Sequence, residues 1–82
     1  MNALFLKRLK ELPSFEFCLW FYIVANSDKY FVFTQTNKEI ANFFNRNHVA
    51  ISQVINKMVK KGFFEVSYGY RGSRKIITNL GF

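Results

Sequence analysis

Basic side chains gather in two short stretches of this 82-residue sequence, where their charge could neutralise a polyanion. Residues 57–75 hold six basic side chains against the single acid Glu65, and residues 7–10 hold three more. Residues 11–56 hold three basic and four acidic side chains, a net of −1, so the positive net charge of +7 comes entirely from these two stretches. Clustered cations of this kind bind the phosphates of nucleic acid or an anionic membrane surface. The basic residues are Lys7, Arg8, Lys10, Lys57, Lys60, Lys61, Arg71, Arg74 and Lys75.

Uncharged polar side chains suited to pairing with base edges lie between the two stretches. Asn and Gln can form paired hydrogen bonds with adenine, and Ser can pair with several bases. A predicted helix beginning at His48 carries such groups on its solvent side at Ser52, Gln53 and Asn56. The first half of that helix has no charge beyond a neutral His48, so its share in binding stays open.

Catalytic and metal-binding patterns find little support in the chain. The five acidic residues are scattered, no glycine-rich phosphate loop precedes a helix, and no nucleophile has an evident base nearby. Cys18 is the one cysteine and His48 the one histidine, which leaves no internal disulfide and no cluster of metal ligands. We therefore expect no enzyme activity, no cofactor, no metal, and a reduced, cytoplasmic setting.

Two helices are predicted at the start of the chain. Residues 2–12 form a short amphipathic helix that Pro13 ends, because proline disfavours helical geometry in the residue before it. Residues 14–26 form a second helix that is apolar on nearly every side, so one of its sides should face another subunit. We therefore expect a homodimer whose interface contains Phe5, Trp20, Phe21 and Tyr22.

A strand and two more helices should follow. Residues 30–34 favour a short strand, and Thr36 with Glu39 matches the capping box that opens a helix to about residue 44. Asn47 is a suitable N-cap for a longer helix over residues 48–61. The apolar residues of that longer helix have the spacing of one buried stripe: Ile51, Val54, Ile55, Met58 and Val59.

A hairpin with a basic tip is predicted to follow the last helix. Gly62 stands where a helix end favours a left-handed residue. Residues 63–68 and 74–78 predict two strands, joined by a turn at residues 69–73. The hairpin is apolar where it would lie on the core and cationic towards the turn.

Two short helices separated by a tight turn and followed by a basic hairpin resemble the winged helix-turn-helix family. The likeness extends over residues 14–78 and is carried by EIANFFNRNHVAISQVINKMVKKGFFEV and by the wing YGYRGSRKII. It implies an α+β, mainly α, winged helix-turn-helix fold in one domain, 1–82. That domain would have an extra N-terminal helix at 1–12, a helical core at 14–62 and a C-terminal β-hairpin wing at 63–78. Arg46 departs from the pattern, since the family usually places an apolar residue in the turn.

The resemblance also implies binding to double-stranded DNA. The wing and the N-terminal helix would set general affinity through phosphates, and the longer helix would select sequence in the major groove. Alternatively, Arg71 or Arg74 would read a minor groove and the helix would be a spacer. The candidate DNA-binding residues are Lys7, Arg8, Lys10, Arg46, Asn47, His48, Ser52, Gln53, Asn56, Lys57, Lys60, Tyr70, Arg71, Ser73, Arg74 and Lys75.

Several roles are compatible with these features. We favour binding to a replication, partition or conjugative-transfer origin of a mobile element, alongside other proteins of a nucleoprotein complex, because an inducible regulator usually needs more chain. A small transcriptional regulator is the alternative, and a protein-interaction module using the winged fold is the second alternative. Membrane attachment through residues 2–12 is a further rival that we do not expect. A signal peptide is disfavoured because Glu11 and Glu16 interrupt the apolar stretch.

Overall fold

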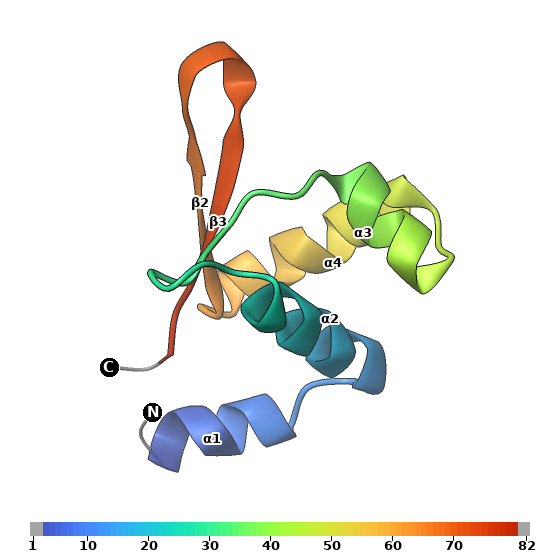
Figure 1. Cartoon of the computed structure of the whole chain (residues 1–82). Helices are drawn as coiled ribbons and strands as arrows, with labels where there is room; N and C mark the ends of the chain where they lie inside the picture. Colours follow the sequence, from blue (N-terminus) through green and yellow to red (C-terminus); the bar gives the residue numbers. More distant parts are fainter. Residues whose placement is uncertain (1–2, 81–82) are drawn as a thin grey trace.

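The computed structural model describes residues 3–80, and its elements follow the order predicted from the sequence (Figure 1). The helices are α1 (Ala3–Lys10), α2 (Ser14–Ala25), α3 (Asn37–Phe44) and α4 (His48–Lys60). The strands are β1 (Val32–Phe33), β2 (Phe64–Tyr68) and β3 (Arg74–Thr78), with the short 3-10 turn η1 (Tyr70–Gly72) between the last two. The fold is α+β and is compatible with a winged helix.

The two N-terminal helices pack their apolar faces against the rest of the chain. In α1, Phe5 and Leu9 are buried four residues apart, which leaves the charged side chains of the helix outside. Pro13 separates the helices in an extended conformation, with φ −54° and ψ 152°. In α2 the buried apolar residues are Leu19, Trp20 and Ile23, whereas Phe21 on the same helix is exposed.

The helix–turn–helix of α3 and α4 is held by side-chain caps. The Thr36 hydroxyl accepts a hydrogen bond from the Glu39 N–H at 3.2 Å and begins α3. Asn45 ends α3 in a left-handed conformation with φ 54°. The Asn47 side chain accepts from the Val49 N–H at 2.7 Å and begins α4. Residues 45–47 therefore form the turn, as the sequence predicts.

The three strands form an antiparallel sheet in the order β1-β3-β2. In this register Phe64 of β2 faces Thr78 of β3, so the hairpin pairs along its whole length. Strand β1 is shorter than the predicted 30–34, because the Asp28 carboxylate accepts the N–H groups of Tyr30 and Val32. That turn leaves two residues to pair with β3.

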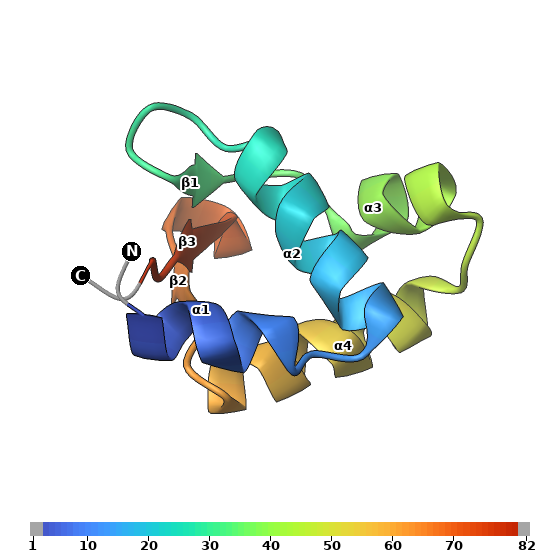
Figure 2. The ribbon, with the colours of Figure 1, turned by 90° about the horizontal axis from the view of Figure 1, so that it is seen from below.

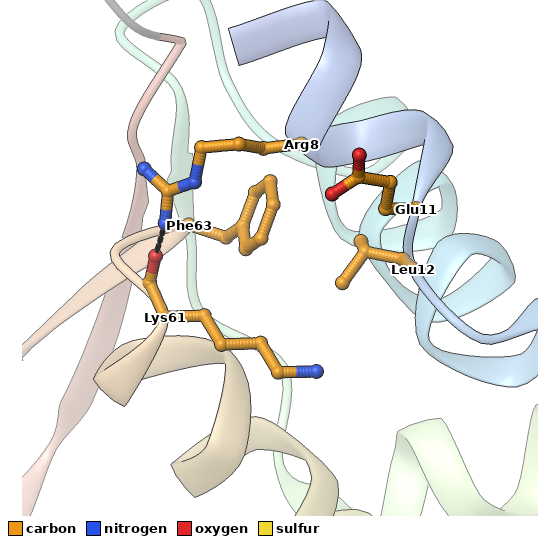
Figure 3. A pocket seen from close by; sticks show the side chains of 5 residues that line it. All are labelled: Arg8, Glu11, Leu12, Lys61 and Phe63. Carbon is orange, nitrogen blue, oxygen red and sulfur yellow. Dashed lines mark hydrogen bonds between the residues drawn. The ribbon is translucent and has the colours of Figure 1, made fainter. Parts of the chain in front are cut away.

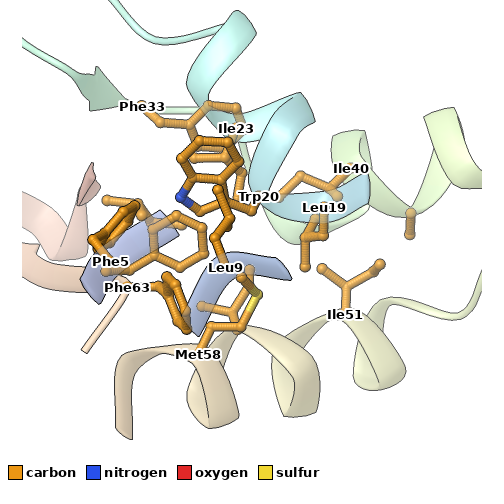
Figure 4. Packing of buried hydrophobic residues seen from close by; sticks show 14 residues of the cluster. Phe5, Leu9, Leu19, Trp20, Ile23, Phe33, Ile40, Ile51, Met58 and Phe63 are labelled. Atoms are coloured by element: carbon orange, nitrogen blue, oxygen red, sulfur yellow. The ribbon is translucent and has the colours of Figure 1, made fainter. Parts of the chain in front are cut away.

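Buried side chains from all four helices and the sheet meet in one core (Figure 4). Figure 2, seen from below, shows α2 in the middle. Helices α1 and α4 lie on one side of it, and α3 lies on the other side. The stripe predicted on α4 supplies Ile51, Ile55 and Met58, each at most 3% exposed. No helix within residues 3–80 is long and apolar enough to cross a membrane.

Candidate nucleic-acid interface

The outer face of α4 presents polar and basic side chains to solvent. Because Ile51, Ile55 and Met58 face the core, residues two positions away from them in the helix face outward. Ser52 is half-buried at the edge of this face. The exposed polar side chains are His48, Gln53, Asn56, Lys57 and Lys60, which include two of the three predicted base-pairing residues, and the apolar Val49 is exposed beside them.

The β2–β3 hairpin projects from the rest of the molecule and exposes its tip (Figure 1). Tyr70 is 83% exposed, and the Arg71 guanidinium lies 5.3 Å from the centre of its ring. Arg71 adopts a left-handed conformation with φ 59° at the turn. Ser73 is engaged in the turn itself, since its hydroxyl donates to the Tyr70 carbonyl at 2.6 Å. Arg71 and the exposed Lys75 are thus the cations that the hairpin offers to a partner.

Arg74 has a different role from its neighbours, because its guanidinium holds the hairpin against the start of α3. One nitrogen donates to Asn37 Oδ1 at 2.6 Å and another to the Gln35 carbonyl at 2.8 Å. Burial lowers the pKa of Arg74, an effect that the nearby Tyr68 opposes. These contacts make Arg74 a positioning residue for the hairpin, and its predicted contact with phosphate stays a prediction.

The basic residues of α1 lie away from the hairpin. Figure 1 places α1 at the end of the molecule opposite the hairpin tip, so Lys7 and Lys10 do not lie beside Arg71. The Arg8 guanidinium packs over the ring of Phe63 at 5.4 Å and donates to the Lys61 carbonyl, at the C-terminal end of α4 (Figure 3). Arg8 thus fastens α1 to the core while its side chain stays exposed, and its contact with phosphate stays a prediction.

Two further basic residues, Arg46 and Lys61, make contacts with other side chains of the same chain. Arg46, in the turn between α3 and α4, stacks over the ring of Phe15 at 4.0 Å. It therefore fills the place where the family pattern has an apolar residue, through a cation–π contact. Lys61 pairs with the buried carboxylate of Glu16 at 3.2 Å and joins α2 to the end of α4.

The four residues predicted for a dimer interface are distributed between the core and the surface. Phe5 and Trp20 are each 5% exposed within the single chain, so both side chains are buried in its core and offer almost no surface to a second subunit. Tyr22 is half-buried, and its hydroxyl donates to Gln35 Oε1 at 2.6 Å. Phe21 is 60% exposed and is the member of the set that stays available.

Sequence reasoning missed several residues near these sites. Gln35 and Asn37 accept hydrogen bonds from the Arg74 guanidinium. Their residue types alone do not predict a contact with a residue nearly forty positions away in the sequence. Phe43 is 67% exposed beside Phe21, and the Phe43–Phe44 pair at the end of α3 was the available signal. Within residues 3–80, no group of three or more His, Cys, Asp or Glu side chains is placed to hold a metal ion.

Comparison with known proteins finds a relative among the helix-turn-helix regulators. No protein-family model and no solved structure matches the chain. A protein of Bacillus subtilis (strain 168), "Uncharacterized HTH-type transcriptional regulator YdcH", is 30% identical over an alignment of 74 residues, and the match covers 87% of this chain. The chain spans about half the length of this curated relative. The relative is named for the helix-turn-helix, the arrangement that α3, residues 45–47 and α4 adopt here.

Proposed function

We propose that this chain binds double-stranded DNA and regulates transcription, with α4 in the major groove and the β2–β3 hairpin on the adjacent backbone. The observation that carries the proposal is the outward face of α4, where Gln53, Asn56, Lys57 and Lys60 are all exposed on a capped helix. The similarity to a relative named as an HTH-type transcriptional regulator supports it.

The major groove accepts one α-helix, and the polar side chains of α4 are spaced to use it. Gln53 and Asn56 are one turn apart, so both amides can meet base edges along the groove floor. Lys57 and Lys60 follow on the same face and would meet phosphates at the groove edge. Phosphate contacts supply affinity for any sequence, whereas the two amides select a site.

The hairpin would add sequence-independent affinity through its tip. Arg71 and Lys75 are exposed and cationic, and Tyr70 beside them can add a hydrogen bond to the backbone. Arg74 would contribute indirectly, because its bonds to Gln35 and Asn37 fix the direction in which the hairpin projects.

Salt dependence of duplex binding tests this proposal. Fluorescence anisotropy with a random-sequence duplex, at salt from ~50 to ~200 mM, should give a slope that falls by about 0.9 for each phosphate that a variant no longer neutralises. We expect the double variant Arg71→Ala/Lys75→Ala to neutralise about two fewer phosphates than the parent chain. The matched control is Lys7→Ala/Lys10→Ala, which removes the same charge from the opposite end of the molecule and should change the slope less. Absence of duplex binding at low salt, or equal slopes for both variants, would overturn the proposed arrangement.

The name of the relative supports a role in transcription over the origin-binding role favoured from the sequence. Origin binding stays a prediction, and it uses the same DNA-binding face. Transcript levels of neighbouring genes in a deletion strain separate the two roles: a regulator changes them, while an origin-binding protein instead changes replication, partition or transfer of the element.

A further inference from the structure

An aromatic groove runs between α2 and α3, away from the outer face of α4. It measures about 530 Å³ and is lined mainly by Phe17, Cys18, Phe21, Tyr22, Phe43 and Phe44. Phe21 and Phe43 are 60% and 67% exposed, and Phe17 is 37% exposed. A contiguous exposed aromatic surface of this kind marks an interaction site in a small protein.

The rings of the groove are already fixed in place by contacts within the chain. Tyr22 lies 4.5 Å from Phe43 and 5.3 Å from Phe44, measured between ring centres, and Phe44 packs edge-on against Phe15. The Tyr22 hydroxyl is held by Gln35. A partner would therefore meet a preformed surface and would not need to order it first.

The groove is uncharged, although the chain carries a net charge of +7. Its lining holds no basic or acidic side chain, while exposed cations lie on α1, on α4, on the hairpin and, outside the groove lining, at Lys38 on α3. An anionic membrane would bind beside those cations, and nucleic acid would do the same. Two copies of this basic chain, by contrast, repel each other least when they meet through an uncharged apolar face.

We propose that a second copy of this chain docks in the α2–α3 groove, with Phe21 and Phe43 of each copy packed against the aromatic lining of the other. A two-fold contact of this type uses the same patch on both subunits. It replaces the interface expected from the sequence, because Phe5 and Trp20 are buried in the core and Phe21 is not. The outer face of α4 stays free in both copies, so the inference extends the proposed DNA binding but does not depend on it for its test.

Sedimentation equilibrium of the full chain without DNA, from ~1 to ~100 µM, tests the docking. We expect a monomer–dimer equilibrium, with a dissociation constant raised at least about tenfold by Phe21→Ser or Phe43→Ser, as for aromatic residues at the centre of an interface. The matched control is Leu4→Ser on α1. Leu4 is 68% exposed, so its replacement removes a similarly exposed apolar side chain and should leave the dissociation constant unchanged.

Cys18 gives an independent readout because it is the one cysteine of the chain, is exposed and lines the groove. Its reaction rate with a maleimide should fall as the protein dimerises, and should stay constant with concentration in the Phe43→Ser variant. A monomer at every concentration, a dimer insensitive to both serine variants, or unprotected Cys18 in the dimer would each overturn the inference. A monomer that binds duplex DNA would contradict the docking inference but not the proposed function. A dimer that binds no duplex DNA would contradict the proposed function but not the docking inference.

Discussion

At the level of single residues, some cations make contacts within the chain and others have no such role in the fold, although Arg8 and Arg46 of the first group are also exposed. Arg74 and Arg8 donate to acceptors more than thirty positions away, and Arg46 stacks on Phe15. Arg71 and Lys75 have exposed side chains at the hairpin tip. Neighbours of the same charge in the sequence can therefore differ in their surroundings: Arg74 bonds to Gln35 and Asn37, whereas Lys75 is exposed.

We expect Arg74→Ala to lower the free energy of unfolding by about 1–2 kcal/mol, because it removes two charge-assisted hydrogen bonds in a half-buried position. Arg74→Lys should recover little of this loss, since one ammonium cannot reproduce the paired geometry of a guanidinium. Urea unfolding followed by circular dichroism measures both, and amide exchange in β2 and β3 should quicken. The control is Arg71→Ala, which should stay within about 0.5 kcal/mol of the parent. Equal losses for the two alanine variants would contradict the positioning role.

At the level of elements, the junction between α4 and the hairpin depends on backbone geometry. Gly62 has φ +88°, a conformation that side chains other than that of glycine strain to adopt. It lets the chain leave α4 and enter β2 directly, while Arg8 of α1 packs over the ring of Phe63 at the same corner. The direction of the hairpin is thus set at both of its ends, at its base by Gly62 and along β3 by Arg74.

Replacing Gly62 by Ala should cost about 1–2 kcal/mol in the free energy of unfolding, through backbone strain and not through a clash. A Cβ at this position would meet the Arg8 side chain at 3.7 Å, which is ordinary contact. Gly69→Ala is the matched control. Gly69 has φ −100°, and a Cβ there would also find its nearest atom at 3.7 Å, so we expect a loss within about 0.5 kcal/mol. Thermal or urea unfolding checks the pair, and a loss no larger at residue 62 than at residue 69 would refute the strain argument.

At the level of the whole molecule, the possible contact surfaces lie on separate elements. The outer face of α4 and the hairpin tip carry polar and cationic groups, and the groove between α2 and α3 is aromatic and uncharged. Helix α1, which is also basic, lies at the end opposite the hairpin tip (Figure 1). DNA binding and self-association can then occur together, because neither covers the other.

A two-fold dimer on DNA should prefer paired sites. Selection of duplexes from a random pool should return two half-sites whose centres are separated by a multiple of ~10.5 bp, since both copies of α4 must reach one side of the helix. Phe43→Ser should bind a single half-site as the parent chain does, and should lose the added affinity for the paired site. Selection of unpaired sites by the parent chain would contradict this arrangement.

The sequence by itself determined the order of the elements and their local ends. Caps at Thr36 and Asn47, the left-handed Gly62 and the apolar stripe of α4 are local signals, because the groups that satisfy them lie within a few residues. The exposed polar face of α4 followed from the same periodicity. A short strand was predicted over residues 30–34, but its reduction to two residues was not, since the Asp28 side chain competes for the backbone N–H groups of the strand.

Only the tertiary structure decided which charged and aromatic residues remain available to a partner. Arg8, Arg46 and Arg74 are candidates for phosphate binding by their type and clustering, but each meets a ring or an acceptor brought near by the fold. Trp20 and Phe21 are adjacent large aromatic residues, and both were predicted to lie in an interface. Successive residues of a helix are rotated by about 100° around its axis, so Trp20 points into the core and Phe21 points outward. Whether such a side chain is buried, bonded or exposed depends on the residues that pack against it from another element. Those residues are distant in the sequence, so no local sequence pattern reveals the contact.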